Sequence, residues 1–124
     1  IVAVHDGERL LLTRYKDRPI KHYALVAGFN EIGESIEETV HREVLEETGV
    51  RVKNLKFYKS QPWVFTDTLL FGFYAELDGD DHLTVQEDEL SEAVWVDRHD
   101  VPEDTTGFSL TAEMIEQFRI GAVK

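Results

Sequence analysis

The chain of 124 residues carries 13 Lys and Arg against 25 Asp and Glu, a net charge of -12, and contains no cysteine. Its length predicts a single domain over residues 1–124, and its charge argues against DNA and an anionic membrane surface as partners, because both require clustered Lys and Arg. The lack of cysteine excludes disulfides, Cys-ligated zinc and a thiol nucleophile, and with no apolar run of the ~18–20 residues that a membrane helix needs, we expect a cytoplasmic location.

Two β-rich segments at the start of the chain predict a hairpin. Residues 1–5 and 9–15 flank the turn Asp6-Gly7, a dipeptide typical of tight turns between strands. The opening run is apolar, starts within a strand pattern and lacks an initiator Met. We therefore expect that sequence upstream of residue 1 is missing, together with any zinc module that it contains.

A short strand and a helix are predicted next. Residues 23–27 are apolar and favour the strand, and a loop follows. Ser35 is a typical N-cap residue, and Glu38, three residues later, completes a capping box. The helix that begins here should run to about Thr48 and end at Gly49, since glycine adopts the left-handed conformation that stops helices.

The second half of the chain predicts three strands and a closing helix. The strands are expected over residues 51–60, 68–77 and 92–97, and the helix over residues 109–118. In the second of these strands, alternation places the stronger apolar set on one face, which we expect to meet the core: Leu69, Phe71, Phe73 and Ala75. Strands interleaved with two helices are typical of an α/β layered fold with a mixed sheet.

Three acidic residues lie along the edge of the apolar stripe of the first predicted helix. Counting about 100° per residue from Ile36, Glu43 falls at about -20° and Glu47 at about +20°. Glu46 lies near about -80°, just beside them. Carboxylates on a partly buried face repel one another and lose hydration, and a bound Mg²⁺ or Mn²⁺ would remove both costs. The alternative is a solvated acidic face paired with Arg42.

The segment from Gly28 to Val50 resembles the Nudix box. Gly28 is followed after five intervening residues by Glu34, and after seven more by a run that fills the remaining positions: Arg42-Glu43-Val44-Leu45-Glu46-Glu47-Thr48-Gly49-Val50. The resemblance implies an α/β/α sandwich with a mixed sheet, and metal-dependent cleavage of a nucleoside diphosphate linked to another moiety. Because such a substrate and this chain are both anionic, a cation is expected between them.

The same resemblance implies which residues form the metal site. Glu43 and Glu47 match the family's metal ligands, and Glu46 matches a further acid of the cluster. The carbonyl of Ala27 matches a backbone ligand. Arg42 completes the catalytic set, in which we expect it to hold the acids in place.

Two further expectations concern the surroundings of these acids. Arg42 can pair with Glu38 or Glu46, each one helical turn away. Glu89 aligns with the family segment that returns an acid to the metal site, with Glu92 as the neighbouring alternative. An exposed acidic loop is the competing interpretation of that segment.

A second motif, from Ser60 to Thr68, resembles a signature of the NADH pyrophosphatase branch of the Nudix family. Its opening Ser-Gln-Pro-Trp and its Phe65 match, whereas Val64 and Thr66 replace two prolines and Thr68 replaces a serine. The lost prolines put the rigidity of the loop and the finer substrate preference in question, because proline fixes the backbone.

Substrate contacts are predicted at this motif and at two other places: Gln61, Pro62, Trp63, Phe65, Thr68, Phe29 and Thr111. Trp63 and Phe65 can stack on a base or a nicotinamide ring, and Gln61 can bind an amide or a ribose. The alternative is that the two aromatic residues belong to the core.

These resemblances imply hydrolysis of the diphosphate bond of NAD(H), giving AMP and nicotinamide mononucleotide. The NAD-capped 5′ end of an RNA is a further substrate that they imply. The alternatives are a Nudix diphosphatase for ADP-ribose or a nucleoside triphosphate, and a non-catalytic nucleotide-binding sensor. A homodimer is expected, as in other members of the branch.

Overall fold

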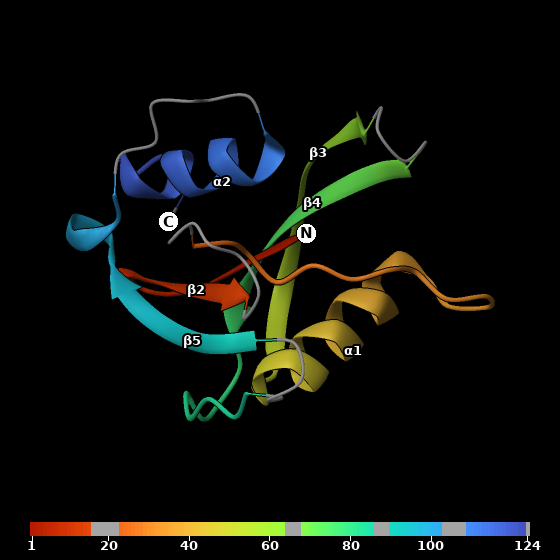
Figure 1. Cartoon of the computed structure of the whole chain (residues 1–124), viewed down its shortest axis with the longest axis horizontal. Coiled ribbons are helices and arrows are strands. Elements are labelled where there is room, and N and C mark those ends of the chain that lie inside the picture. The colour runs from red at the N-terminus through yellow and green to blue at the C-terminus, as the bar shows by residue number, and fades with distance from the viewer. Residues whose placement is uncertain (16–22, 64–67, 86–89, 103–108, 124) are drawn as a thin grey trace.

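The computed structural model describes residues 1–15, 23–63, 68–85, 90–102 and 109–123. Over this part of the chain a five-stranded mixed sheet lies between two helices, which confirms the expected α/β/α sandwich (Figure 1). The strands and helices have these bounds: β1 (Val2–Asp6), β2 (Arg9–Tyr15), α1 (Ile36–Thr48), β3 (Val52–Trp63), β4 (Thr68–Leu77), β5 (Leu90–Asp97), the short 3₁₀ helix η1 (Arg98–Asp100) and α2 (Leu110–Arg119). None of the helices in these ranges combines the length and the apolar character needed to cross a membrane.

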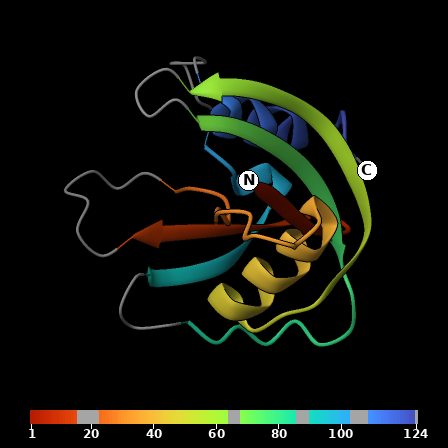
Figure 2. The same ribbon diagram turned by 90° about the vertical axis from the view of Figure 1, so that its right-hand side faces the viewer.

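The sheet has the strand order β3-β4-β1-β2-β5. β1 and β4 are parallel, and the other neighbouring strands are antiparallel. The predicted hairpin of β1 and β2 is confirmed, with His5 opposite Leu10 and Asp6 opposite Arg9. β3 is an edge strand that curves along the outer border of the molecule (Figure 2).

The prediction of a strand over residues 23–27 is wrong, because this segment forms two isolated bridges instead. The N–H of Val2 donates to the carbonyl of Val26 at 2.8 Å, and Ala24 exchanges two backbone hydrogen bonds with Thr13, at 2.7 and 2.8 Å. β1 and β2 pair with each other beside their turn, so their opposite ends have backbone groups that this segment satisfies. The bridges carry the chain directly from the sheet toward α1.

α1 begins and ends where the sequence predicts. The hydroxyl of Ser35 accepts from the N–H of Glu38 at 3.1 Å, and the Glu38 carboxylate accepts from the N–H of Ser35 at 3.0 Å. Gly49 has a φ of 78° and closes the last turn. The helix buries Val40 and Val44 against the sheet, which turns the neighbouring Glu47 inward.

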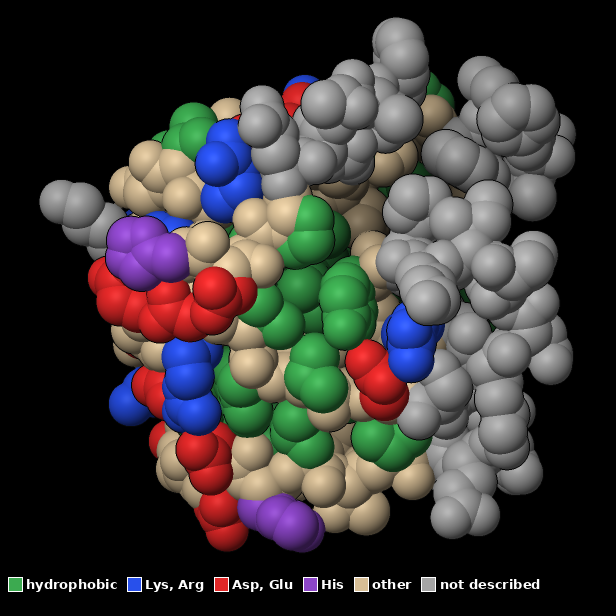
Figure 3. Space-filling model, turned by 60° about the vertical axis from the view of Figure 1, so that its left-hand side comes forward, with side chains coloured by type: hydrophobic (Ala, Val, Ile, Leu, Met, Phe, Trp, Pro, Cys, Tyr) green, Lys and Arg blue, Asp and Glu red, His purple; other side chains and the backbone are tan. Residues whose placement is uncertain are grey.

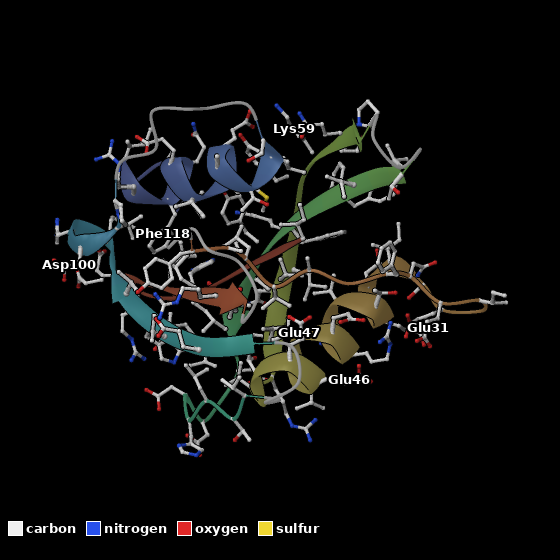
Figure 4. All side chains as sticks on the ribbon, viewed as in Figure 1. Glu31, Glu46, Glu47, Lys59, Asp100 and Phe118 are labelled. Atoms are coloured by element: carbon white, nitrogen blue, oxygen red, sulfur yellow. The ribbon has the colours of Figure 1, made fainter. Side chains whose placement is uncertain are left out.

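Both faces of the sheet are buried, so the prediction of a single core face for β4 is only half right. Phe73 and Ala75 belong to the core on the α1 side, as expected. Tyr74, on the other face, is only 4% exposed because α2 covers it, whereas Leu69 is 55% exposed. Figure 4 shows Phe118 of α2 pointing into this second core.

Candidate active site

The three carboxylates of α1 differ in how deeply they lie. The side chain of Glu43 is 16% exposed and that of Glu46 is 53% exposed, whereas Glu47 is 7% exposed. Figure 4 shows Glu47 between α1 and the sheet, with Glu46 further out on the helix. This order is the one that the helical period predicts, since Glu43 and Glu47 flank the buried stripe and Glu46 lies beside it.

Arg42 is the centre of a hydrogen-bond network beside these acids. Its Nε and Nη2 hold both carboxylate oxygens of Glu34, at 2.7 and 3.0 Å. Its Nη1 donates to Glu43 at 2.8 Å and to Glu46 at 3.2 Å, and Nη2 also donates to the carbonyl of Phe29 at 3.0 Å. A guanidinium has five N–H groups, and these five contacts occupy all of them. Arg42 therefore fixes two acids of the helix and the preceding loop relative to one another.

Glu34 is the bidentate partner of Arg42, a pairing that was not predicted from the sequence. The expected pair with Glu46 is confirmed, but in the described part of the chain Arg42 does not pair with Glu38, whose carboxylate caps the helix. The guanidinium and then the hydroxyl of Thr39 lower the pKa of Glu34 to about 2, so the pair stays charged at neutral pH. The signal for this role was present, because Glu34 is a defining position of the box.

The loop before α1 is tied to the helix by side chains. Asn30 donates through Nδ2 to the carbonyl of Glu34 at 2.9 Å and to the hydroxyl of Thr39 at 2.7 Å. That hydroxyl donates in turn to the Glu34 carboxylate at 2.6 Å. These contacts hold the loop in one shape, with Phe29 77% exposed beside the acids.

The backbone at Gly28 passes directly against the Glu43 carboxylate. A Cβ built on Gly28 would lie 2.0 Å from Cδ of Glu43, a distance that no side chain could keep. Glycine at this position therefore lets the segment from the sheet approach the acids of α1. Ala27, the residue before it, lines the same cavity as these acids, and its role as a backbone ligand stays a prediction.

A cavity of about 1000 Å³ opens beside the acids. Its walls come from the loop before α1, from α1, from the beginning of β4 and from the first residues of α2. It brings together predicted site residues from separate parts of the chain: Ala27, Phe29, Arg42, Glu43, Glu46, Glu47, Thr68 and Thr111. The half-exposed Leu69 also lines it, so this residue, which we expected in the core, faces the cavity instead.

The remaining predicted residues lie outside the cavity wall or outside the described residues. The side-chain oxygen of Gln61 accepts from the backbone N–H of Leu110 at 3.0 Å and so supports the first turn of α2. Pro62 is exposed on β3. Phe65, Glu89 and the side chain of Trp63 are not among the described residues, so their predicted roles stay predictions.

The donor atoms beside the cavity suit a hard cation. Glu43, Glu47 and the Ala27 carbonyl offer oxygen ligands, which Mg²⁺ and Mn²⁺ prefer. Within the described ranges, no three His, Asp or Glu side chains are spaced to hold a metal ion by themselves. A metal site on these two carboxylates would therefore take further ligands from backbone carbonyls, from water or from the undescribed segment that contains Glu89.

Comparison with known proteins agrees with the Nudix box. A sequence profile of the NUDIX domain matches residues 1–118. The chain is 41% identical over 107 residues to the NAD-capped RNA hydrolase NudC of Mannheimia succiniciproducens, covering 82% of this chain and 39% of that protein. It is 41% identical over 118 residues to the protein of the same name from Pseudomonas syringae pv. tomato, covering 95% of this chain and 42% of that protein. The chain thus spans about two fifths of the length of these relatives.

Solved structures share the fold. A NUDIX hydrolase from Nitrosomonas europaea superposes with a TM-score of 0.80 at 21% identity, over 96% of this chain and 67% of that one. The NUDIX domain of Shewanella oneidensis NrtR, crystallised with ADP ribose, superposes with a TM-score of 0.70 at 21% identity, over 98% of this chain and 86% of that one. At such low identity these likenesses establish the architecture alone.

Proposed function

The chain belongs to the NUDIX family, and we propose that it hydrolyses the diphosphate bond of NAD(H), giving AMP and nicotinamide mononucleotide, with the NAD-capped 5′ end of RNA as a second substrate. The observation that carries the proposal is the convergence of Glu43, Glu47 and the exposed ring of Phe29 on one cavity. The names of the NudC relatives support the choice of substrate. A homodimer remains an expectation from the resemblance.

Glu43, Glu47 and the Ala27 carbonyl would hold the Mg²⁺ or Mn²⁺ that the proposed reaction requires. When bound, such an ion polarises phosphoryl oxygens and makes a bound water a better nucleophile. Arg42 acts on the carboxylates, because it fixes Glu43 from one side while Gly28 lets the backbone approach from the other. The protein thus supplies a preorganised set of oxygens in a net acidic chain that would otherwise repel a diphosphate.

The first turn of α2 supplies a candidate contact for the substrate phosphates. Leu110 donates its N–H to Gln61, and Ala112 donates its N–H to the hydroxyl of Ser109 at 3.0 Å. Thr111 lies between them and lines the cavity, and its N–H has no partner among the described residues. Backbone N–H groups at a helix N-terminus favour anions, so we assign Thr111 a backbone contact with the substrate.

A product assay tests the proposal. NADH, NAD⁺, ADP-ribose and ATP are incubated separately with the protein and Mg²⁺ or Mn²⁺, and the products are separated by chromatography. AMP with reduced nicotinamide mononucleotide, formed fastest from NADH, is the expected result. Turnover of ADP-ribose or ATP without NADH would keep the metal chemistry and overturn the substrate. Tight nucleotide binding without any turnover would favour a sensor.

The variant Glu47→Gln tests the assignment of the acids. It is nearly isosteric and removes a buried charge, so the fold should persist while turnover falls at least about 100-fold, since losing even an outer partner of a metal ligand costs about 10- to 100-fold. Calorimetric titration with Mn²⁺ should show weaker binding. Glu37→Gln, on the exposed first turn of α1, is the matched control and should behave like the wild type. Wild-type turnover by Glu47→Gln would contradict the assignment.

A further inference from the structure

Three lysines of β3 lie on one face of the sheet although their spacing in the sequence opposes this. Residues three apart on a regular strand point to opposite faces. Lys53, Lys56 and Lys59 are opposite Glu76, Tyr74 and Gly72 of β4, which are two residues apart and therefore share a face. The register of β3 shifts between Lys53 and Lys56 and again before Lys59. The two irregularities thus align the three lysines.

The shared face is the one that α2 covers. Lys59 reaches Glu113 of α2 at 2.8 Å, and Lys56 lines a depression together with Gln117 of the same helix. All three lysines are exposed, and β3 has no strand on its outer side among the described strands. The result is a row of lysines about 7 Å apart along the open edge of the sheet, since their partners on β4 are two residues apart.

This row is distinctive in an acidic chain. Its members are all the lysines that the described ranges contain, in a protein with a net charge of -12. Figure 3 shows one face of the molecule, on which Asp and Glu side chains lie along one border of an apolar centre, interspersed with Lys and Arg. The lysines of the described ranges are therefore gathered on the edge of β3.

The row also leads to the candidate active site. Beyond Lys59, β3 continues to Gln61 on the same face, which supports Leu110, a residue of the cavity wall. Figure 4 shows Lys59 near the end of β3, on the side of α2. A polyanion attached to a substrate in the cavity could therefore continue along the edge of β3.

We propose that Lys53, Lys56 and Lys59 bind phosphates of the RNA that follows the NAD cap, so that this RNA leaves the cavity along the outer edge of β3. The inference rests on the proposed function, and it adds a path for the RNA body. Two carboxylates face the row. Glu76 is held by Asn54 at 2.5 Å, and the Glu113 pair with Lys59 is half exposed, so a phosphate can compete for the ammonium group.

Lysines on an edge strand also prevent pairing with other strands. That role requires charge on the edge but does not require alignment on one face. The two roles differ in what they predict, because only a phosphate path makes the hydrolysis of capped RNA depend on these lysines and on salt.

The test compares K53Q/K56Q with the wild type on NADH and on an NAD-capped RNA of ten nucleotides. The logarithm of kcat/KM for the RNA should fall with the logarithm of salt concentration, with a slope that is smaller by about 0.7 for each lysine removed. Between 50 and 200 mM salt, the wild type should therefore lose about sevenfold more kcat/KM on RNA than the variant does. The values for NADH should be the same in both proteins.

The control R9Q/R119Q removes the same charge from β2 and from the end of α2, and its salt slope on RNA should equal that of the wild type. A salt slope on RNA that is the same in K53Q/K56Q as in the wild type would overturn the inference. Turnover of NADH in that case would still support the proposed function. An equal change in the control would also overturn the inference, since the effect would then be one of net charge. A wild type that cleaves neither substrate would reject the proposed function and, with it, the RNA path.

Discussion

Gly28 illustrates how a single residue without a side chain shapes the candidate site. Gly28→Ala would place a Cβ 2.0 Å from Cδ of Glu43, so the carboxylate must move from its position beside the cavity. We expect kcat/KM for NADH to fall about 10- to 100-fold, as when support for a metal ligand is lost. The melting temperature should change little, because the displaced group borders a cavity. Chromatographic rates and a thermal melt measure the two effects.

The same substitution at Gly72 is the control, because it should affect stability and not activity. A Cβ there would meet Sδ of Met114 at 2.7 Å in the core on the α2 side. Gly72→Ala should therefore lower the free energy of unfolding by about 1–3 kcal/mol, the usual cost of overpacking, with kcat/KM nearly unchanged. Loss of stability without loss of activity in Gly28→Ala would contradict the role given to that glycine.

Phe29 offers a second test at the level of one side chain. Its ring is 77% exposed and lines the cavity, so it does not contribute a buried contact to the fold. Phe29→Ala should raise KM for NADH, because stacking on a base is worth about 1–3 kcal/mol, and should leave the melting temperature unchanged.

The control for Phe29 lies three residues away. Ile32 is on the same loop and is fully exposed, but it is not among the residues that line the cavity. Ile32→Ala should keep the wild-type KM. Equal KM values for the two variants would mean that Phe29 does not touch the substrate.

The loop before α1 and the helix itself act as one element. Arg42 joins them through Glu34 and the Phe29 carbonyl, and Asn30 adds contacts with Thr39. Arg42→Lys keeps the charge but offers one ammonium group in place of a planar fork, so it cannot hold all these acceptors. We expect affinity for Mn²⁺ and kcat/KM to fall about 10- to 100-fold, measured by calorimetry and product release.

Arg51→Lys is the matched control for this loss, because Arg51 is exposed before β3 and does not line the cavity. It should bind Mn²⁺ as the wild type does. Wild-type affinity in Arg42→Lys would mean that the network shapes the loop without supporting the metal ligands.

Elements defined by neighbours in the sequence were predictable. The capping box of Ser35 and Glu38, the stop at Gly49 and the inward turn of Glu47 all follow from local rules, and the structure has each of them. The bridges of residues 23–27 were not predictable, because they depend on how far two other strands pair. A short apolar segment fits a strand pattern equally well whether it forms a continuous strand or two isolated bridges.

The arrangement of the site depends on contacts between elements that are distant in the sequence. The side chain of Gln61 was predicted to contact the substrate. In the structure its oxygen accepts a hydrogen bond from the N–H of Leu110, 49 residues further along the chain. Leu69 alternates with core residues, yet it is 55% exposed and lines the cavity. A sequence pattern identifies which residue types are available, whereas packing decides which of them reach the cavity.

The molecule as a whole has two cores, one on each face of the sheet, and a histidine lies beside the second. His5 is 5% exposed, with its ring 6.5 Å from that of Tyr74 and 6.0 Å from that of Phe118. Burial lowers the pKa of His5 below its usual value of 6.5, and Arg98 acts in the same direction, while Glu76 opposes them. The folded protein therefore favours the neutral imidazole.

The sign of the resulting pH dependence follows from proton linkage. Below about pH 6.5 the unfolded chain binds a proton at His5 that the folded chain resists, so the free energy of unfolding contributed by this group falls as the pH drops. Above that pH both states are neutral at His5, and the contribution is constant. Carboxylates also titrate in acid, so the pH dependence of the wild type alone does not separate the contribution of the histidine.

His5→Phe isolates it, because phenylalanine keeps a ring between Tyr74 and Phe118 and cannot be protonated. Thermal melts between pH 5 and pH 8 should give a difference in melting temperature between His5→Phe and the wild type. This difference should shift in favour of His5→Phe as the pH falls. His41→Phe, at an exposed position of α1, is the control for exchanging an imidazole for a phenyl ring outside the core. Parallel curves for His5→Phe and the wild type would mean that His5 is protonated as readily in the folded protein as in the unfolded chain.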